Sequence, residues 1–452
     1  MIKWLYPGMH VKRWLLLLMF GIVVIGLGID YVLRELYDSV TFPDFVYYVT
    51  LQFLPRFVRA ALFFAVGVGT IALAIARLNS SLLSPFLTSA QDLSLVDRVY
   101  RHHMLRRGPK IVAVGGGTGL STLLRGLKQY TGNLTAIVTM ADDGGSSGRL
   151  RRELGVPPPG DFRQCLAALA DAEPLMSRLL QHRFTEGMGL GGHSFGNLFI
   201  VAMAEVTGTF ERAIHESCRV LAVRGQVLPS TLADVTLCAE FEGDEHIAGE
   251  SRIGEVGKPI RRAYLRPEHP PAYPEAVRAV RDADLIVIGP GSLYTSILPN
   301  LLVQEIARTV KASSALKVYV CNVATQRGET ENYRVIDHVQ ALEHQLGEGL
   351  FQYVVVNSNL PARTPDVQPV VLSGEEAERY HVVEADVADP QHPRMHQPLK
   401  LAQALMRLYY DRASGSGLPP TSRADADGRG AGDAVPPDSL TGPASRDLVP
   451  GG

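Results

Sequence analysis

Short apolar runs alternate with longer amphipathic stretches between residues 110 and 412. The short runs are continuous and rich in β-branched residues, which is typical of parallel strands covered on both faces. We predict strands over Ile111–Val114, Thr135–Thr139, Leu285–Ile288, Lys317–Cys321 and Tyr353–Val356. We predict helices over Leu120–Tyr130, Phe162–Asp171, Phe195–Val206, Ser296–Lys311 and Tyr333–Leu346. This alternation predicts an α/β fold: a Rossmann-like, doubly wound, mostly parallel sheet with ligands at the carboxyl ends of its strands.

One stretch inside this region has a different pattern. Ser230–Glu240 and Ile247–Ile253 flank a polar turn, Phe241–His246, as the two arms of an antiparallel hairpin do. Arg262–Arg266 supplies a candidate third strand. We therefore expect a small β-rich insertion between the two halves of the main sheet.

Two long apolar stretches, Trp14–Leu33 and Phe57–Ala76, precede the α/β region. Each is close to the roughly 20 residues that cross a hydrocarbon core. A cleaved signal peptide explains only the first, and a pair of buried core helices is the other alternative. Basic residues gather outside the pair, so the positive-inside rule predicts a transmembrane hairpin with both ends in the cytoplasm. We expect a multi-pass protein of the inner (plasma) membrane, with its main domain in the cytoplasm.

These patterns divide the chain into successive segments. We expect a cytoplasmic N-terminus (1–13), transmembrane helix 1 (14–33), an external loop (34–56), transmembrane helix 2 (57–76), a linker (77–109), the α/β domain (110–412) and a tail (413–452). The tail is rich in Gly, Pro, Ser, Ala and Asp and has few large apolar residues. It cannot bury enough surface to offset its chain entropy, so we expect it to be disordered.

Composition narrows the function classes. The formal net charge of -2 gives no indication of a nucleic-acid partner. The 4 cysteines are widely spaced and form no CxxC pair, so neither a zinc site nor a disulfide framework is expected.

A glycine-rich loop follows the first predicted strand and opens a helix. It consists of Gly115, Gly116, Gly117, Thr118 and Gly119. Backbone N–H groups of such a loop can close on an anion at a helix N-terminus. The loop ends in neither Gly-Lys-Ser/Thr nor a strict GxGxxG, and a tight strand-to-helix turn without a ligand remains the alternative.

A second loop, at the end of the next strand, combines carboxylates, hydroxyls and an arginine. An acid about 20 residues after a glycine loop takes ribose hydroxyls in dinucleotide folds, or holds a divalent cation through oxygen ligands. Asp142 is placed for either role. If it holds a metal, we expect that metal to be Mg²⁺. A solvated loop before a charged helix is the structural alternative. The candidate ligand-binding residues here are Asp142, Asp143, Gly144, Ser146, Ser147 and Arg149.

Three more clusters are candidates for the same pocket. Asp161 and Arg163 begin one predicted helix, where Asp161 is also a candidate N-cap. His193 and Asn197 begin the next, although a lone histidine is more often structural. A further strand–glycine–helix turn and the strand after it supply the candidates Gly289, Gly291, Ser292, Tyr294 and Asn322. We expect the first four of these last residues to contact phosphate, base or sugar, and Asn322 to line the same rim.

Together these motifs closely resemble the YvcK-like gluconeogenesis factors, within the broader CofD-like group named after 2-phospho-L-lactate transferase. The resemblance rests on Ala113–Leu120, Ala141–Leu150, Pro158–Asp161, Gly192–Leu198 and Gly289–Asn300. It implies a Rossmann-like fold and a role in growth and cell shape on gluconeogenic carbon sources. It also implies binding of a nucleotide-sugar such as UDP-N-acetylglucosamine, with links to cell-wall precursor supply.

The leading expectation is a membrane-anchored, nucleotide-sugar-binding regulator. No dedicated nucleophile or base is obvious, so we assign no catalytic residue. The runner-up is a CofD-type, magnesium-dependent transferase of a phospho-lactyl group, which positioning and charge neutralisation would serve. A nicotinamide oxidoreductase does not fit the glycine spacing. The expected partners are the nucleotide-sugar, the membrane through the hairpin, further copies of the chain, and cell-wall or regulatory proteins.

Overall fold

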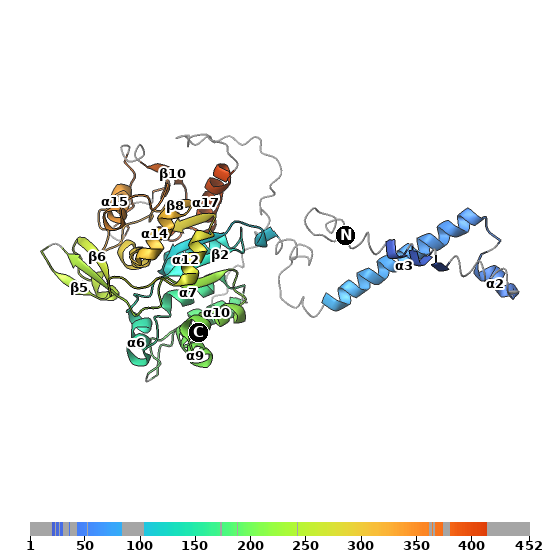
Figure 1. Ribbon diagram of the computed structural model, residues 1–452, viewed down its shortest axis with the longest axis horizontal. Coiled ribbons are helices and arrows are strands. Elements are labelled where there is room, and N and C mark those ends of the chain that lie inside the picture. Colours follow the sequence, from blue (N-terminus) through green and yellow to red (C-terminus); the bar gives the residue numbers. More distant parts are fainter. Residues whose placement is uncertain are drawn as a thin grey trace, which may run out of the picture.

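A computed structural model describes residues 20–22, 24–26, 28–29, 36, 43–51, 53–83, 104–171, 174–187, 189–241, 243–360, 364, 367–373 and 380–413. An α/β body begins near residue 104, and the helices α2 (Asp44–Val49) and α3 (Arg56–Leu83) lie to one side of it (Figure 1). Of the first expected span (14–33), only residues 20–22, 24–26 and 28–29 are described, and most of the expected linker and all but the first residue of the expected tail lie outside the described residues.

Within the described residues, the main sheet has seven strands in the order β10–β9–β8–β7–β1–β2–β3, and every neighbouring pair is parallel. The strands are β1 (Ile111–Gly115), β2 (Leu134–Val138), β3 (Gln226–Pro229), β7 (Leu285–Ile288), β8 (Leu316–Val320), β9 (Tyr353–Asn357) and β10 (His381–Ala385). The five central strands were predicted within one or two residues. The prediction of a mostly parallel, Rossmann-like sheet is therefore confirmed.

The strand order reverses between β1 and β7. The chain leaves β1 toward β2 and β3, returns to pair β7 on the other side of β1, and then continues outward to β10. Right-handed crossovers that run in opposite directions place their helices on opposite faces of a sheet. The reversal therefore produces a covered, doubly wound sheet and a crevice at the carboxyl ends of β1 and β7.

Helices pack on this sheet in two groups. α5 packs between α7 and α17, and α12 packs against α14. The long apolar side chains of β1, β2, β7, β8 and β9 are buried together with the inner faces of these helices in one continuous core. The helices of the body are α5 (Gly117–Leu127), α6 (Gly145–Leu154), α7 (Gly160–Leu169), α8 (Pro174–Gln181), α9 (Phe195–Thr207), α10 (Phe210–Val220), α11 (Glu250–Ile253), α12 (Pro274–Arg281), η3 (Leu293–Ile297), α13 (Leu298–Leu301), α14 (Gln304–Ala312), α15 (Val335–Leu346) and α17 (Pro398–Ala413).

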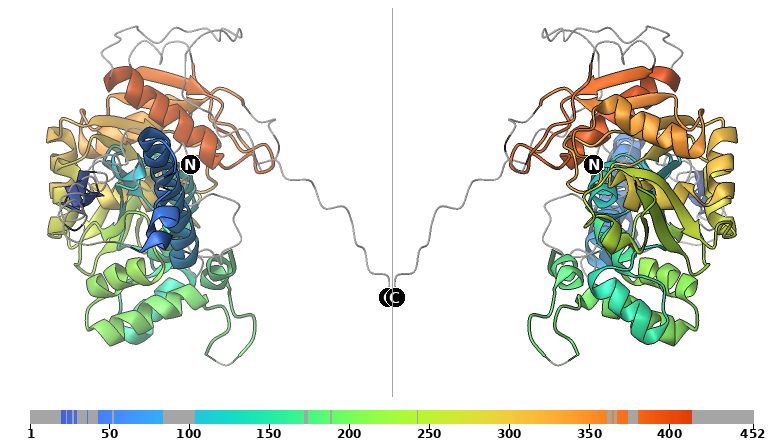
Figure 2. Two further views of the ribbon diagram at one scale, coloured as in Figure 1. Left: turned by 90° about the vertical axis from the view of Figure 1, so that its right-hand side faces the viewer. Right: turned by 90° about the vertical axis from the view of Figure 1, so that its left-hand side faces the viewer.

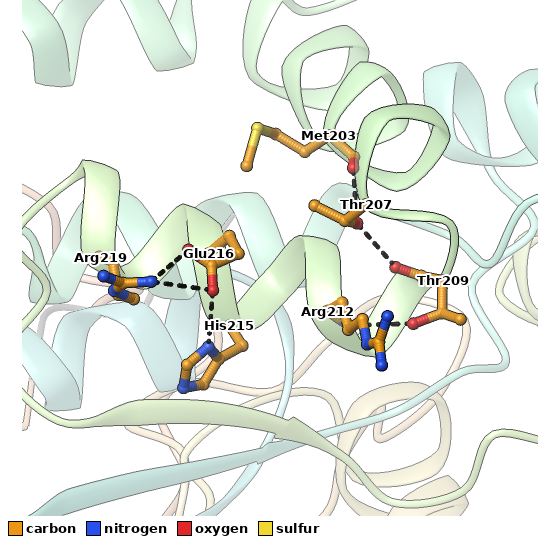
Figure 3. Close-up of polar contacts among 7 residues, drawn as sticks. All are labelled: Met203, Thr207, Thr209, Arg212, His215, Glu216 and Arg219. Carbon is orange, nitrogen blue, oxygen red and sulfur yellow. Dashed lines mark hydrogen bonds and ion pairs between the residues drawn. The ribbon is translucent and has the colours of Figure 1, made fainter.

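A tight corner joins α9 to α10. α9 ends at Gly208, whose φ of 84° is left-handed and favours glycine. The Thr209 hydroxyl then caps α10 by accepting the Arg212 N–H at 3.3 Å, and the Thr207 hydroxyl donates to the Thr209 carbonyl at 3.2 Å (Figure 3). The corner joins α9 directly to α10, which packs against it.

The expected β-rich insertion is present. β4 (Thr236–Phe241) pairs antiparallel with β5 (His246–Ala248) and β6 (Ile260–Arg266), in the order β5–β4–β6. The small sheet lies on the side of the body opposite α3, and it faces the viewer in the right-hand view of Figure 2. The second strand is shorter than predicted, because the chain turns at Gly249 and enters α11.

The prediction of a transmembrane hairpin is wrong for the part of the chain that the structure describes. No helix there is both long and apolar enough to cross a membrane. The second expected span lies in α3, where Arg59 and Arg77 confine the uncharged stretch to positions 60–76. That uncharged stretch is 17 residues long, at the short end of the range for a membrane span. The expected localisation as a multi-pass protein of the inner (plasma) membrane is contradicted with it.

Candidate functional site

A cavity of about 290 Å³ opens at the carboxyl ends of β1 and β7, where the strand order reverses. The two predicted glycine loops face each other across it, and two later segments of the chain complete its wall. Its lining residues are Gly116, Gly117, Thr118, Gly119, Thr122, Pro290, Gly291, Ser292, Ser296, Asn322, Ala324, Thr325, Gln326, Arg394, Met395 and His396. In open α/β sheets, this crevice is the place where ligands bind.

The first loop needs glycine at several positions. Gly117 has a left-handed φ of 62°, which glycine adopts without strain. A Cβ on Gly119 would lie 2.4 Å from the Pro290 carbonyl oxygen, so the two loops approach backbone to backbone. Gly116 is the N-cap of α5 and lacks a side-chain cap, so the first N–H groups of this helix lie at the cavity wall. This is the geometry that favours an anion.

Asp161 lies beneath this loop. It is in the first turn of α7, and its carboxylate accepts the Gly117 N–H. A Cβ on Gly116 would lie within contact of that carboxylate, so the loop closes tightly over it. Burial, and secondarily the charge of Asp142, raises the pKa of Asp161 to about 7. Asp161 therefore supports the first loop from inside and is not its own helix's N-cap, which is Pro159.

Three further carboxyl groups, those of Asp142, Asp143 and Glu250, share this region with Asp161. Asp142 accepts the Gly144 N–H at 3.0 Å and bonds to Ser147, while burial raises its pKa. Burial and then the charges of Asp142, Asp143 and Asp161 raise the pKa of Glu250 to about 8. Asp143 instead accepts the Ser251 N–H at 2.9 Å and ties this loop to α11.

These carboxylates fit a hydrated Mg²⁺ ion better than a caged metal. Mg²⁺ keeps several waters and is held by one or two carboxylates together with ligand phosphates. No group of three or more His, Cys, Asp or Glu side chains among the described residues forms a metal cage. The charge of Asp142, the predicted magnesium ligand, contributes to the raised pKa values of Asp161 and Glu250, and a cation on Asp142 would offset it.

Four predicted site residues form a buried network beside the cavity instead of lining it. The Ser146 hydroxyl lies 2.9 Å from His193 Nδ1 and accepts Asn197 Nδ2 at 3.0 Å. Arg163 Nε donates to Asn197 Oδ1 at 3.0 Å. Burial, and then the charge of Arg149, lowers the pKa of His193 and favours its neutral form. The network joins the starts of α6 and α9 to α7, and so holds the acidic loop in place.

Arg149 also lies away from the cavity lining. Its Nη2 donates to the Gly191 carbonyl at 3.0 Å and anchors the loop before α9. The acidic loop that contains Asp142 thus lies close to the first glycine loop. Its arginine, Arg149, instead supports the neighbouring backbone at Gly191.

The second glycine loop already holds an anion of its own. The Glu329 carboxylate, whose pKa burial raises, accepts the Ser292 hydroxyl, the Thr295 hydroxyl at 3.1 Å and the Tyr294 N–H at 3.4 Å. It therefore caps η3 in the place where a phosphate would bind a helix N-terminus. Tyr294 is buried and its hydroxyl lies 2.9 Å from that of Tyr333, away from the cavity lining.

Asn322 holds the second loop at the rim, where it was expected. Its Oδ1 accepts the Gly291 N–H at 3.2 Å and its Nδ2 donates to the Gly291 carbonyl at 2.8 Å. Gly289 has a left-handed φ of 79° and is buried below the loop. The second loop therefore forms a fixed wall of the cavity, and most of its N–H and hydroxyl groups already have acceptors within the protein.

Sequence reasoning missed the segment before α17. Arg394 is exposed. Among the described residues that line the cavity, it is the one with a positive charge. His396 is buried, and its Nε2 lies 3.2 Å from the Cys321 carbonyl. Burial lowers the pKa of His396 to about 4, so the ring is neutral and Nε2 carries the donated proton. The available signal was the polar run His392–Gln397 before a helix, which lacks the strand–glycine–helix pattern of the other loops.

The fold and the cavity define a doubly wound α/β protein with a ligand crevice between two glycine loops. The sequence pattern of the family "2-phospho-L-lactate transferase CofD" matches residues 111–397, and the chain belongs to that family.

Curated relatives carry a narrower name. The chain is 46% identical over 421 residues to a Nostoc protein named "Putative gluconeogenesis factor", a match covering 90% of this chain and 92% of the relative. It is 56% identical over 250 residues to the "Gluconeogenesis factor" of Bacillus subtilis, covering 55% of this chain and 79% of the relative. The crystal structure of a UPF0052 family protein from Bacillus halodurans matches with a TM-score of 0.64 and 44% identity, covering 66% of this chain and 99% of that one.

Proposed function

We propose that the glycine-loop cavity binds a nucleotide-sugar such as UDP-N-acetylglucosamine, and that the chain acts as a ligand-binding regulator. The observation that carries this proposal is the position of the cavity at the reversal of strand order, with the N-terminus of α5 in its wall. The diphosphate would lie on the N–H groups of Thr118 and Gly119 and on Arg394, because the Gly117 N–H is already donated to Asp161. This refines the expectation from sequence, because the second loop is capped by Glu329.

The rest of the cavity suits the polar ends of such a ligand. The side chains of Thr325 and Gln326 line the same wall as Asn322 and offer hydroxyl and amide groups to a sugar or a base. The volume of about 290 Å³ lies near the lower end of the range for ligand pockets, so part of a nucleotide-sugar would extend to the surface.

The names of the relatives support a metabolic role. Several proteins similar to this chain are named as gluconeogenesis factors. We propose that sensing a nucleotide-sugar links carbon supply to the provision of cell-wall precursors and to cell shape, through regulatory protein partners.

A specific observation favours a second candidate function. The charges of Asp142 and Asp161 interact, and Asp161 accepts the Gly117 N–H of the first glycine loop, where Mg²⁺ would meet a bound phosphate. A CofD-type transferase would use this ion to neutralise charge as a phospho-lactyl group passes from a nucleotide donor to an acceptor hydroxyl. In that case this chain's own residues orient the donor through α5 and Arg394.

Calorimetric titration of the full chain tests the two functions. The regulator predicts saturable binding of UDP-N-acetylglucosamine, weakened about tenfold or more by Arg394→Gln, since a charge-assisted contact of 1.5–3 kcal/mol is lost. Arg278→Gln, on the outer face of α12, is the matched control and should bind normally. Absence of binding to the wild-type chain, or unchanged affinity in Arg394→Gln, would contradict the proposed site.

Turnover separates the candidates. Magnesium-dependent release of a nucleoside monophosphate from a phosphoester donor, abolished by Asp142→Asn, would support the transferase. Binding of the nucleotide-sugar without any release would support the regulator.

A further inference from the structure

A second cavity, of about 390 Å³, lies away from the glycine loops. It is enclosed by β6 of the small sheet on one side and by α13, α14 and the end of α15 on the other. The residues that line it are all different from those that line the first cavity. It is therefore a separate site, and what binds there does not depend on the function proposed for the glycine loops.

Positive charge gathers on one wall of this cavity. Arg308 and Lys311 are three residues apart on α14, so their side chains share a face of the helix. Arg262 lines the facing wall on β6, and Glu268 is the acidic residue among the described lining residues. The cavity is therefore basic although the whole chain has a formal net charge of -2.

The two α14 cations have only neutral partners among the described residues. Arg308 Nη2 donates to the Gln304 amide oxygen at 3.0 Å, and Lys311 Nζ donates to the Leu346 carbonyl. Arg262 differs, because its Nη1 lies 3.8 Å from Glu240 Oε1. The Arg262 guanidinium also lies over the Tyr264 ring. Arg308 and Lys311 thus make no ion pair with a described carboxylate, and the cations among the described lining residues outnumber the one acidic residue there, Glu268, which is complementary to an anion.

The floor between the charged walls is apolar. Leu302 at the end of α13 and Leu346 at the end of α15 are half-buried and form its accessible part, while Leu301 and Ala307 line it but are buried. A bare inorganic ion would leave this surface in water, whereas an organic ligand would cover it and gain about 25 cal/mol for each Å² buried. The basic side chains and the apolar floor together favour an anion that also has an apolar organic part.

We propose that the second cavity binds a small organic phosphate, with its phosphate between Arg308 and Lys311 and its organic body over Leu302 and Leu346. Arginine matches phosphate oxygens through two parallel N–H donors, and lysine adds a compact charge. The volume is within the usual range for pockets that hold small molecules.

Titration of the full chain with AMP as the probe tests this proposal. The double variant Arg308→Gln/Lys311→Gln should bind AMP at least about tenfold more weakly than the wild type, because two charge-assisted contacts are lost. The matched control is Arg278→Gln/Arg281→Gln, which removes two cations with the same spacing from the neighbouring helix α12, outside the cavity. It should bind AMP as the wild type does. Arg394→Gln, in the first cavity, should also leave this binding unchanged.

Two further measurements keep the result decisive. A crystal structure with AMP should show it between α14 and β6, and inorganic phosphate should bind more weakly than AMP because it leaves the apolar floor uncovered. Circular dichroism should show that the double variant is folded, since Arg308 is exposed and Lys311 is half-buried. Failure of AMP to bind the wild-type chain, AMP bound elsewhere, equal affinity for inorganic phosphate, or unchanged affinity in the folded double variant would overturn the proposal.

Discussion

Asp161 is the residue on which the first glycine loop rests, and it holds that position at an electrostatic cost. The residue is half-buried, and its carboxylate accepts the Gly117 N–H and interacts with the charge of Asp142. The N–H bond favours the charged form, but burial outweighs it and the pKa rises to about 7. The loop is thus supported by a group that changes charge near neutral pH.

This makes the stability of the protein depend on pH in a defined direction. The pKa of Asp161 is 3.8 in the unfolded reference and about 7 in the folded chain, so the folded state holds its proton more tightly. The stability from this group is full below about pH 4 and is lost as the pH rises through about 7, on the order of a few kcal/mol. Asp161→Asn keeps an oxygen acceptor for Gly117 and removes the charge. We expect it to unfold at a higher temperature than the wild type at pH 8, with the advantage smaller at pH 5 and absent below about pH 4.

Thermal unfolding measured across this pH range checks the prediction. Glu250→Gln is the informative comparison, because the pKa of Glu250 is raised to about 8 and its effect should appear at higher pH. Parallel pH profiles for the wild type and Asp161→Asn would show that the carboxyl group is not perturbed as described.

At the scale of elements, η3 depends on a side chain from a distant loop. Glu329 binds the Ser292 and Thr295 hydroxyls and the Tyr294 N–H, and it replaces the partner that a helix N-terminus otherwise takes from solvent. Glu329→Ala leaves buried donors without an acceptor, so we expect a loss of about 2–4 kcal/mol in the free energy of unfolding.

The matched variant is Glu329→Gln. It retains one acceptor oxygen and loses the buried charge, and should therefore lose much less stability than Glu329→Ala. Chemical denaturation of the three chains gives the comparison. Equal losses for the alanine and glutamine variants would mean that the side chain acts through its charge alone, contrary to its role as a cap.

Elements differed in how far their sequences predicted them. The strands β1, β2, β7, β8 and β9 are covered on both faces, so their apolar runs are continuous and were recognised. β3 and β10 form the two edges of the sheet, and both carry exposed or half-buried positions. β3 also has only 4 residues and ends in Pro229. Edge strands have mixed patterns that resemble loops, and for that reason they were missed.

The candidate site was only partly predictable for a related reason. Glycine loops are recognisable because each follows a strand and opens a helix, and both proved to line the cavity. The roles of single polar residues depend on contacts between distant segments. Ser146, Arg163, His193 and Asn197 satisfy one another, whereas Arg394 reaches the cavity from a segment that follows the last strand. No local pattern distinguishes these two outcomes.

At the scale of the whole molecule, the cavity joins the two halves of the sheet. The first loop belongs to the half that contains β1, β2 and β3, and the second belongs to the half that begins with β7. A ligand that binds only the folded state stabilises it according to its concentration and affinity, by about 2.7 kcal/mol at 100 times the dissociation constant. Because both halves line the cavity, that stabilisation should extend to both.

Hydrogen exchange of the full chain with and without UDP-N-acetylglucosamine tests this coupling. We expect slower amide exchange in the first turns of α5, in η3 and around His396 at the same ligand concentration, since one binding event covers all three. Gly119→Ala should abolish the protection, because its Cβ would lie 2.4 Å from the Pro290 carbonyl oxygen and force the two loops apart. Gly254→Ala is the control, since its Cβ would meet nothing within 4 Å. Protection confined to α5 would mean that the ligand contacts one half of the sheet only. The second loop and the segment before α17 would then not take part in binding.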